Sequence, residues 1–327
     1  MRTPKRKKDH IELSLKKESQ YSFTAGFECV NLLHNSLPEC SLYDVDTSVK
    51  FLGKKISMPL VISAITGGYP KAKSINKGLA EAAQKAGVAF GLGSQRAMIE
   101  NPKLADTYKV RDVAPDIPIL ANIGAAQLNE YKFNDIKKLV SVVEADGLAI
   151  HLNPLQEVIQ PEGDVDFSGV LSVIEKICDN IDVPVIVKET GAGMSDSVVV
   201  QLSGAGADWV DVAGAGGTSW SKIEYMRGGG VPGFENWGIP TVESIILCRG
   251  LLPVIASGGV RSGIDMAKAI ALGADMAGAA QPFLEAFFKK RLEKELETWK
   301  KQFRIAAFLT GSRNVGELKK AKFTLKS

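Results

Sequence analysis

The stretch that decides the fold is Gly147-Leu-Ala-Ile-His-Leu-Asn-Pro-Leu-Gln-Glu157. Its first four residues form a short apolar run, which predicts a strand buried on both faces. Such a strand should end in turn residues, yet an imidazole, two side-chain amides and a carboxylate follow within seven positions. Because polar groups at the end of a buried strand indicate a site, residues 151–157 are the first candidate.

The same strand pattern recurs along the chain, and amphipathic segments separate the apolar runs. The eight runs are Leu60–Ala64, Val88–Gly91, Ile117–Asn122, Gly147–Leu152, Val183–Lys188, Trp209–Ala213, Leu252–Ala256 and Met276–Ala280. Helices are expected at Lys71–Ala86, Asn101–Val113, Asn134–Glu144, Val170–Ile181, Ser195–Ser203, Thr241–Leu247 and Gly263–Leu272, with a long closing helix over Pro282–Leu309. Continuous apolar strands that alternate with helices predict an α/β fold, a closed (β/α)8 TIM barrel. A doubly wound open sheet is the alternative.

The N-terminal part of the chain differs from this repeat. We expect two regions, a basic arm and extension over residues 1–58 that packs on the barrel, and the barrel itself over 59–327. Within the extension, Val49–Ile56 reads as a hairpin about Gly53 that plugs or flanks the core. The basic head Arg2–His10 is a solvated tail from composition alone. The alternative is an arm that folds over an anionic ligand.

Composition restricts the class of protein and of partner. The chain has 327 residues, of which 45% are hydrophobic, and this suits one large domain. Because Lys and Arg outnumber Asp and Glu by only 40 to 37, a dedicated nucleic-acid binder is not expected, and the partner should be a small molecule. Four widely spaced cysteines favour reduced thiols. No apolar run reaches the roughly 18 to 20 residues that span a bilayer, so we expect a soluble, cytoplasmic protein without a membrane partner.

The last two strand ends carry a candidate phosphate site. Ser257-Gly-Gly-Val-Arg261 follows the seventh strand, and Gly278-Ala-Ala-Gln281 belongs to the eighth. Barrels bind phosphate groups in these two loops, where glycines expose backbone N–H groups and a helix begins. Arg261 adds a positive charge. The alternative interpretation is a set of tight turns that packs the next helix.

Other strand ends offer partners for a planar polar ring. Thr66-Gly-Gly68, Ser94-Gln-Arg96, Asn122 and Lys188 supply hydroxyl, amide and cationic groups around the expected barrel mouth. A flavin suits these groups, because an ammonium near its pyrimidine side stabilises the anionic reduced form. The alternative for Lys188 is a lysine that caps a strand end and pairs with Glu189.

Taken together, these motifs resemble the type 2, FMN-dependent isopentenyl-diphosphate isomerases over residues 6 to 316. The residues that carry the resemblance are Arg6-Lys-Lys-Asp-His10, Thr66-Gly-Gly68, Gly93-Ser-Gln-Arg96, His151–Glu157, Lys188-Glu189, Gly216-Gly-Thr-Ser-Trp220 and Gly258-Gly-Val-Arg261. The resemblance implies interconversion of isopentenyl diphosphate and dimethylallyl diphosphate by a proton shift. It also implies reduced FMN as acid and base, NADPH as reductant, Mg²⁺ on the diphosphate, and a homotetramer or homo-octamer.

The resemblance further implies a role for each site residue. His151 and Asn153 hold substrate and flavin in register, Gln156 lies beside the migrating proton, and Glu224 forms a relay with Gln156. Glu157 binds Mg²⁺. Substrate-binding residues are expected at Arg6, Lys7, His10, Arg96 and Gln156, which turns the basic arm into a lid. Cofactor-binding residues are expected at Ala64, Ile65, Thr66, Gly67, Ser94, Asn122, Lys188, Thr218, Gly258, Gly259, Arg261, Ala280 and Gln281.

Several alternatives stay open. From the residues alone, Glu224 is equally well a surface acid on a short helix, and Glu157 a helix-capping or solvated acid. An FMN oxidoreductase of the hydroxy-acid oxidase or dihydroorotate dehydrogenase type is the first rival function. A non-catalytic barrel that binds a phosphate ligand is the second. The glycine-rich segment Gly228–Gly238 is expected to be a mobile loop over the mouth.

Overall fold

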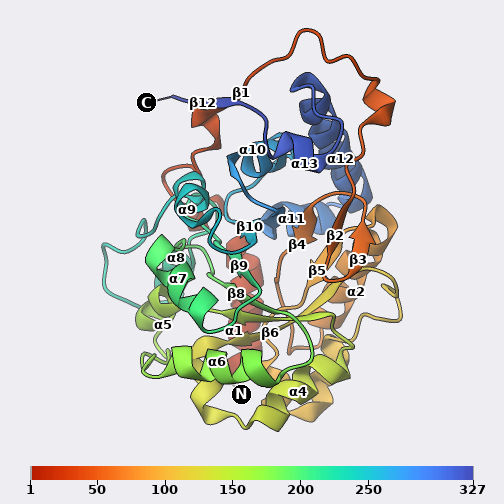
Figure 1. The fold of residues 1–327 in the computed structure, drawn as a ribbon. Helices are drawn as coiled ribbons and strands as arrows, with labels where there is room; N and C mark the ends of the chain where they lie inside the picture. The colour runs from red at the N-terminus through yellow and green to blue at the C-terminus, as the bar shows by residue number, and fades with distance from the viewer. Residues whose placement is uncertain (1, 327) are drawn as a thin grey trace.

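Eight parallel strands close into a barrel in the computed structural model, which describes residues 2–326 (Figure 1). The sheet closes where Ala277 pairs with Leu60. In chain order the strands are β4 (Leu60–Ile62), β5 (Ala89–Gly91), β6 (Ile119–Gly124), β7 (Gly147–His151), β8 (Val185–Lys188), β9 (Trp209–Asp211), β10 (Val254–Ala256) and β11 (Met276–Ala279). All eight predicted strands and the closed (β/α)8 barrel are confirmed, and the open sheet is wrong.

Helices surround the barrel and bury one face each against the strands (Figure 1). Six of them lie where the sequence predicts: α2 (Ala72–Ala86), α4 (Phe133–Val142), α6 (Val170–Asn180), α7 (Asp196–Gly204), α9 (Thr241–Cys248) and α10 (Gly263–Leu272). Short elements occupy strand-end loops, namely α3 (Arg96–Glu100), η5 (Ala125–Glu130), α5 (Pro154–Ile159) and α8 (Trp220–Met226). Among residues 2–326, no helix has both the length and the apolar character needed to cross a membrane.

Two helix predictions are wrong in detail. The segment Asn101–Val113 contains only a 3-10 helix, η4 (Pro102–Thr107), because Asn101 is extended and its side chain accepts a hydrogen bond from Lys103 N. The closing helix is two helices, α11 (Gln281–Phe288) and α12 (Leu292–Leu309). Lys290 between them has a φ of 54°, a left-handed conformation that ends one helix and turns the chain back. The rings of Phe283 and Trp299 then pack 4.7 Å apart across the two helices.

The N-terminal extension contacts both ends of the barrel. It contains α1 (Arg2–Ser14), η1 (Lys17–Ser19), η2 (Phe27–Cys29), β1 (Val30–Leu32), η3 (Leu42–Asp44), β2 (Val49–Phe51) and β3 (Lys54–Ile56). Its β1 pairs with β12 (Phe323–Leu325), which follows α13 (Val315–Leu318), so this part of the extension lies beside the C-terminal strand (Figure 1). Because α1 is a helix that lines the barrel-mouth cavity, the expectation of a solvated tail is wrong. The division at residues 58 and 59 stays a prediction.

The hairpin plugs the bottom of the barrel. Strands β2 and β3 pair antiparallel about Gly53, as predicted. Phe51 and Ile56 are 1% and 2% exposed, and the Phe51 ring meets the edge of Trp209 at 5.0 Å. The apolar cluster that they complete contains one residue from each of six strands: Val61, Ala89, Leu120, Ile186, Ile255 and Met276. The plug therefore closes the end of the barrel opposite to the strand C-termini.

Three aspartates at the start of strands fix the register beside this plug. Asp146, Asp208 and Asp275 each follow an alanine. Their side chains accept hydrogen bonds from Ile119 N, Val185 N and Val254 N, at 2.8, 2.8 and 3.0 Å. Each aspartate N–H also donates to the carbonyl of the same partner residue. The backbone N–H and C=O of the first residue of each preceding strand are thus both bonded to the aspartate before the next strand.

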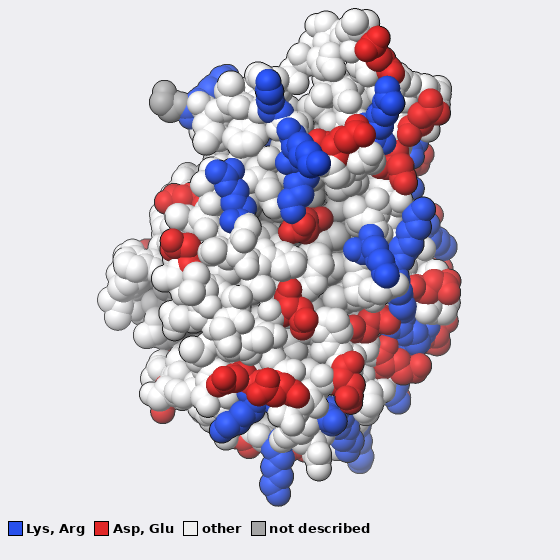
Figure 2. Space-filling model, in the orientation of Figure 1, with Lys and Arg blue, Asp and Glu red and all other residues white. Residues whose placement is uncertain are grey.

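Surface charge agrees with the sequence balance. Lys and Arg side chains alternate with Asp and Glu side chains over the face drawn in Figure 2. Several surface charges form ion pairs, for example Lys77 with Asp112 and Lys319 with Asp275. The four cysteines, all within the described chain, are unpaired.

Candidate active site

The main cavity lies at the barrel mouth, where the C-terminal ends of the eight strands meet. Every strand-end loop contributes to its wall, and α1 contributes Lys7, His10 and Ile11. Active sites of this fold lie at this end of the barrel. The predicted site residues in the wall are Arg6, Lys7, His10, Ala64, Ile65, Ser94, Arg96, Asn122, His151, Asn153, Gln156, Glu157, Lys188, Thr218, Gly258, Gly259, Arg261, Ala280 and Gln281.

Three predicted site residues lie outside the wall. Thr66 is 1% exposed, and its carbonyl accepts hydrogen bonds from the Gly93 N–H and from an amide side chain of α2. Gly67 lies against the ring of Tyr108, which is so close that a Cβ on Gly67 would meet the ring at 1.9 Å. Glu224 is fully buried behind Gln156. Thr66 and Gly67 therefore support the wall from behind, and Glu224 reaches the cavity only through a neighbour.

Glu157 is a buried carboxylate that is held on both oxygens. It lies in the first turn of α5, which Pro154 begins, and it is 7% exposed. Its Oε1 accepts from Asn153 Nδ2 at 2.8 Å. Its Oε2 accepts from Gln160 Nε2 at 3.2 Å and from Asp164 N at 2.9 Å. A solvated acid is excluded, and Glu157 faces the cavity with a fixed orientation.

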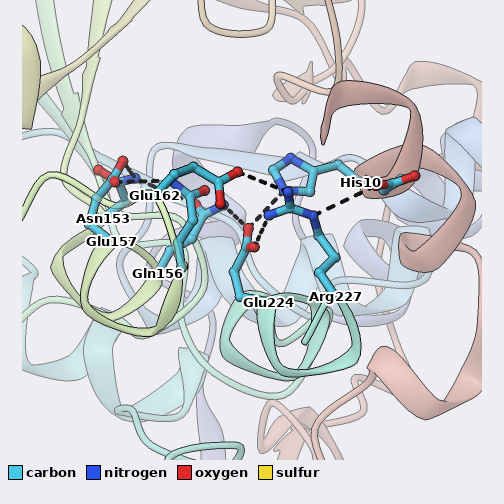
Figure 3. Close-up of polar contacts among 9 residues, drawn as sticks. His10, Asn153, Gln156, Glu157, Glu162, Glu224 and Arg227 are labelled. Carbon is cyan, nitrogen blue, oxygen red and sulfur yellow. Dashed lines mark hydrogen bonds and ion pairs between the residues drawn. The ribbon is translucent and has the colours of Figure 1, made fainter. Parts of the chain in front are cut away.

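Glu224 is the centre of a hydrogen-bonded chain that joins three segments (Figure 3). Gln156 Nε2 donates to its Oε1 at 3.0 Å, and His10 Nε2 lies 2.7 Å from the same oxygen. Arg227 donates to Oε2. Burial opposes ionisation of Glu224, but the His10 and Gln156 hydrogen bonds and the Arg227 charge outweigh it, so its pKa is lowered. Glu224 is therefore an ionised, buried acid and not a surface acid.

His151 is held as a neutral imidazole. It ends β7 beside Asn122, and its Nδ1 lies 2.8 Å from Asn122 Oδ1. Since an amide oxygen only accepts, Nδ1 donates and Nε2 is left as an acceptor. Burial and the positive charge of Lys188 lower the pKa of His151 to about 3. The strand register places Lys188 directly beside His151, which explains why its charge adds to the effect of burial.

Lys188 takes part in a buried polar group that the sequence did not reveal. Its Nζ donates to the Glu189 carbonyl and lies 3.9 Å from Asp211 Oδ2. Asp211 also accepts from Ser257 Oγ at 2.5 Å. The carboxylate of Glu189 turns instead to the backbone, where it accepts from Thr190 N at 2.6 Å. Burial raises the pKa of Glu189 to about 7 in spite of that backbone contact.

The loops after β10 and β11 present backbone groups to the cavity. Gly258 and Gly259 have φ values of 94° and 68°, a left-handed conformation that favours glycine. Arg261 Nη1 donates to the carbonyl of Gly216 at 3.2 Å, and its Nη2 donates to Gln20 Oε1 at 3.1 Å. Gln281 begins the eight-residue helix α11 at the same rim. Exposed amides, a helix start and one arginine thus converge there.

Two cations lie at the opposite rim. Arg96 Nη1 pairs with Asp164 Oδ2 at 2.9 Å, and its Nε pairs with Glu100 at 2.7 Å. Lys7 Nζ donates to the Ser94 carbonyl at 3.0 Å. Burial and the neighbouring charge of Arg6 lower the pKa of Lys7 to about 7. The cavity thus has cationic groups on two sides.

Sequence reasoning missed Asp164, Asp211 and Arg227. Asp211 ends β9 and lies inside the predicted apolar run Trp209–Ala213, so a charged residue there carried a usable signal. Arg227 follows Glu224 by three residues, the spacing at which opposite charges pair along a helix. Asp164 follows α5 and carried no such signal.

Comparisons with known proteins give the family. A model of the FMN-dependent dehydrogenases matches residues 166–325. An isopentenyl-diphosphate delta-isomerase from Archaeoglobus fulgidus is 46% identical over 332 residues, covering 98% of this chain and 96% of that protein. Proteins with the same name from Rickettsia felis and Nostoc sp. are 46% and 44% identical, covering 98% and 97% of this chain and 96% and 94% of their own lengths.

Solved structures agree on the fold. A mandelate oxidase variant with a monooxide FMN adduct has a TM-score of 0.67 at 18% identity, covering 97% of this chain and 92% of that chain. Mandelate oxidase with (S)-2-phenylpropionate has a TM-score of 0.63 at 19% identity, covering 98% and 97%. Identities this low show a shared barrel and nothing more. From its near-full-length relatives, the chain belongs to the isopentenyl-diphosphate delta-isomerase family.

Proposed function

We propose that this protein interconverts isopentenyl diphosphate and dimethylallyl diphosphate, with reduced FMN as acid and base and Mg²⁺ on the diphosphate. The observation that carries the proposal is the 46% identity to the isomerase of Archaeoglobus fulgidus over 98% of the chain. The cavity supports it, because it gathers the arm residue His10 with Gln156 and Glu157 at one mouth.

The donor set of the cavity fits FMN. Ser63 Oγ is buried and has no hydrogen-bond partner among the described residues, so one hydroxyl is free for a ring atom. Asn122 and Lys188 lie in the same wall, and Lys188 would stabilise an anionic reduced ring. The loop of Gly258 and Gly259 would hold the phosphate through its backbone. When bound, reduced FMN supplies an acid and a base strong enough to exchange protons with a hydrocarbon.

The carboxylate inventory fits a cation that shares its ligands with a substrate. Among the described residues, no group of three or more His, Cys, Asp and Glu side chains is placed to hold a metal ion. Glu157 would be the protein carboxylate, and Asn153 Oδ1, which has no partner within residues 2–326, is a free acceptor beside it. Mg²⁺ is typically bound through one or two carboxylates and completes its octahedron with water and phosphate oxygens.

Cations from α1 and from the second loop would hold the diphosphate. Arg96 already lies between two acids, which fix the direction of its guanidinium. Because the pKa of Lys7 is lowered to about 7, a neighbouring diphosphate would draw a proton onto this lysine and gain a second charged contact. We therefore expect substrate binding to order α1 further over the mouth.

Gln156 would orient the reacting end of the substrate. An amide has no titratable proton of its own near neutral pH, but Glu224 fixes its Nε2 by accepting the hydrogen bond. Its Oε1 lies 3.5 Å from Asn153 Nδ2 on the cavity side. Gln156 would thus place an amide of fixed direction at the hydrocarbon end of the substrate, with the ionised carboxylate of Glu224 behind it.

One observation argues against His151 as the base of an oxidoreductase of the hydroxy-acid type. Such an enzyme needs a base whose pKa is near the working pH. His151 is the histidine at this position of the mouth, and its pKa is lowered to about 3. A neutral, weakly basic imidazole suits a positioning role.

The remaining parts of the proposal concern the reductant and the assembly. NADPH would reduce FMN, and the protein would act in the cytoplasm as a homotetramer or homo-octamer. Mass measured by light scattering, with and without FMN, tests the assembly. Bleaching of the flavin absorption by NADPH under nitrogen tests the reductant.

The experiment for the reaction uses pure protein incubated anaerobically with FMN, NADPH, Mg²⁺ and isopentenyl diphosphate in deuterated water. We expect NMR to show dimethylallyl diphosphate and deuterium in the product. A mixture without Mg²⁺ is the control. No product with flavin bound would reject the proposal, and turnover of lactate or dihydroorotate would favour the oxidoreductase. Binding of both ligands without proton exchange would favour a non-catalytic barrel.

A further inference from the structure

Arg227 joins three segments of the barrel mouth through acidic side chains (Figure 3). It follows the last residue of α8, and its side chain is 12% exposed. Its Nη1 donates to Glu224 on the same helix, and its Nη2 donates to Glu162 Oε1 at 2.9 Å. Its Nε lies 3.9 Å from Asp9 Oδ2 on α1. One guanidinium thus contacts α8, the loop after α5, and the arm.

The contact with α1 is the loosest of the three. Arg227 Nε is buried and has no hydrogen-bond partner among the described residues. Asp9 is about 1 Å too far for a normal N–H···O bond. A small approach of α1 to the mouth would complete this bond and satisfy the buried donor. Arg227 therefore has a free group that favours the closed position of the arm.

We propose that Arg227 is a positioning residue that fastens α1 over the cavity and, through the same guanidinium, keeps Glu224 ionised and aimed at Gln156. This inference rests on the proposed function for its effect on turnover. The effect on α1 itself does not depend on that function. Arg227 lines no part of the cavity wall and acts only through Glu224, Glu162 and Asp9.

The physical reason is that a buried carboxylate needs a compensating charge. Without Arg227, Glu224 would keep only the hydrogen bonds of His10 and Gln156, while its burial would remain complete. Its pKa would then rise, and its second oxygen would stay buried without a hydrogen-bond donor. The carboxylate would be free to turn away from its neighbours, so the amide of Gln156 would lose its fixed direction and α1 would lose the contact of His10 with Glu224.

Other charged groups also act on the pKa of Glu224, so the effect of Arg227 must be separated from their effects. From η1, which also packs against α8, the charged residues Lys17 and Glu18 are exposed. The remaining charged or titratable groups around Glu224 are Arg6, Asp9 and His10 on α1, Glu157 on α5 and Glu162 in the loop that follows it. Only Arg227 donates to the second carboxylate oxygen of Glu224 among them.

The test compares Arg227→Met and Arg227→Lys in the FMN-loaded enzyme, with Lys222→Met as the matched control. Lys222 lies on the same helix, and its Nζ donates to the Gln20 carbonyl without contacting Glu224. Hydrogen exchange of residues 2–14 is measured first, because it needs no turnover. For Arg227→Met we expect exchange of α1 about 10-fold faster or more, as for a segment that opens more readily. Lys222→Met should leave the exchange of α1 and the activity unchanged.

Kinetics then separate fastening from the charge effect. Loosening of α1 raises KM, whereas loss of the Glu224 charge lowers kcat. We expect Arg227→Met to lower kcat about 10- to 100-fold, the range seen for supporting residues of active sites. Because the pKa of Glu224 rises in this variant, the acid limb of its pH profile should move to higher pH. Arg227→Lys should recover part of kcat. FMN absorption should not change.

The outcomes distinguish the two proposals. Wild-type exchange of α1 and an unshifted kcat profile in Arg227→Met would overturn this inference even if the isomerase is confirmed. Absence of isomerase activity in the wild type would reject the proposed function, while faster exchange in Arg227→Met would still support the fastening. If Arg227→Met fails to fold, Asp9→Ala removes the α1 contact alone. It should speed α1 exchange and raise KM without shifting the pH profile, and an unchanged α1 would overturn the fastening.

Discussion

The two ends of the barrel use their polar residues in opposite ways. At the bottom, the carboxylates of Asp208 and Asp275 accept hydrogen bonds from backbone N–H groups of neighbouring strands, beside the apolar plug of Phe51. At the mouth, Glu224 and His151 face other side chains in a buried space. The first arrangement fixes strand register, and the second arranges chemical groups around a cavity.

Unsatisfied groups show the same difference. Buried side-chain polar atoms nearly always find hydrogen-bond partners, so exceptions need an explanation. Six buried polar side-chain atoms lack partners among the described residues. Ser63 Oγ, Asn153 Oδ1 and Arg227 Nε lie at or behind the mouth, whereas Arg304 Nε lies on α12, away from the cavity. The three aspartates of the bottom are satisfied. The unpaired polar atoms in the wall, Ser63 Oγ and Asn153 Oδ1, are therefore available to a ligand, whereas the three aspartates of the bottom already have backbone partners.

The largest expected effect is on turnover at the mouth. Gln156→Ala should lower the isomerase rate about 10²-fold or more, because a reacting group misplaced by about 1 Å costs about that factor. The free energy of unfolding should change by less than about 1 kcal/mol, because Gln156 is half-buried and lies in a short helix. Steady-state kinetics with FMN absorption as the measure of retained cofactor check this. Unchanged turnover would remove Gln156 from the site.

The second prediction concerns the bottom of the barrel, where a substitution should lower stability and leave turnover unchanged. Phe51→Ala should lower the free energy of unfolding by about 3–5 kcal/mol, because a fully buried aromatic ring is lost from the plug. KM should stay unchanged, since the plug lies at the opposite end from the cavity. Guanidinium chloride unfolding measures the loss, and Lys50→Ala, an exposed change on the same strand, is the control. A loss of less than 1 kcal/mol, on the order of a surface substitution, would mean that the hairpin is not part of the core.

The third prediction concerns one hydrogen bond of the register. Asp208→Ala leaves the Val185 N–H without its acceptor and should destabilise the protein by about 1–3 kcal/mol. Asp208→Asn keeps an oxygen acceptor, so its loss should be smaller. The same pair at Asp275 should behave alike, and the two alanine losses should add, since the residues lie on different strands. Equal losses for alanine and asparagine would show that charge, and not the acceptor, matters.

The sequence predicted the barrel because its signal is local. Each strand is an apolar run such as Gly147–Ile150, and placing polar residues after such runs was enough to put His151 and Lys188 at one mouth. Their direct contact could not be predicted, because it depends on the register between β7 and β8. The sequence also could not predict which way the side chains of a loop point. Thr66, which was predicted to line the cavity, is buried behind its wall.

The arm shows why composition misled. Arg2–His10 has too little apolar character to predict a packed helix, and as an isolated peptide it would have little reason to fold. In the structure, α1 gains its position from tertiary partners, with Lys7 bonded to the Ser94 carbonyl and His10 to Glu224. These partners lie 87 and 214 residues away in the chain. Composition offered an arm over an anionic ligand only as the alternative, and the resemblance to a family then favoured a lid.

The smallest expected effect is a pH dependence of stability that originates at the mouth. The pKa of His151 is lowered to about 3 in the folded protein, from 6.5 for an ordinary histidine. Between these two values the unfolded chain binds one more proton at this site than the folded chain. Stability is therefore fully present above the unfolded pKa and is lost as the pH falls. The loss from this site should be about 1 kcal/mol between about pH 6.5 and about pH 5.5.

His151→Gln removes this titration and should flatten the profile by that amount. His34→Gln removes a histidine from an exposed position and is the matched control. Urea unfolding of both variants and the wild type at five pH values measures the difference. If the His151→Gln profile matches that of the wild type, the imidazole at the mouth is not held neutral by burial. The two ends of the barrel would then differ only in how their polar groups are hydrogen-bonded, and not in how burial affects the protonation of a side chain.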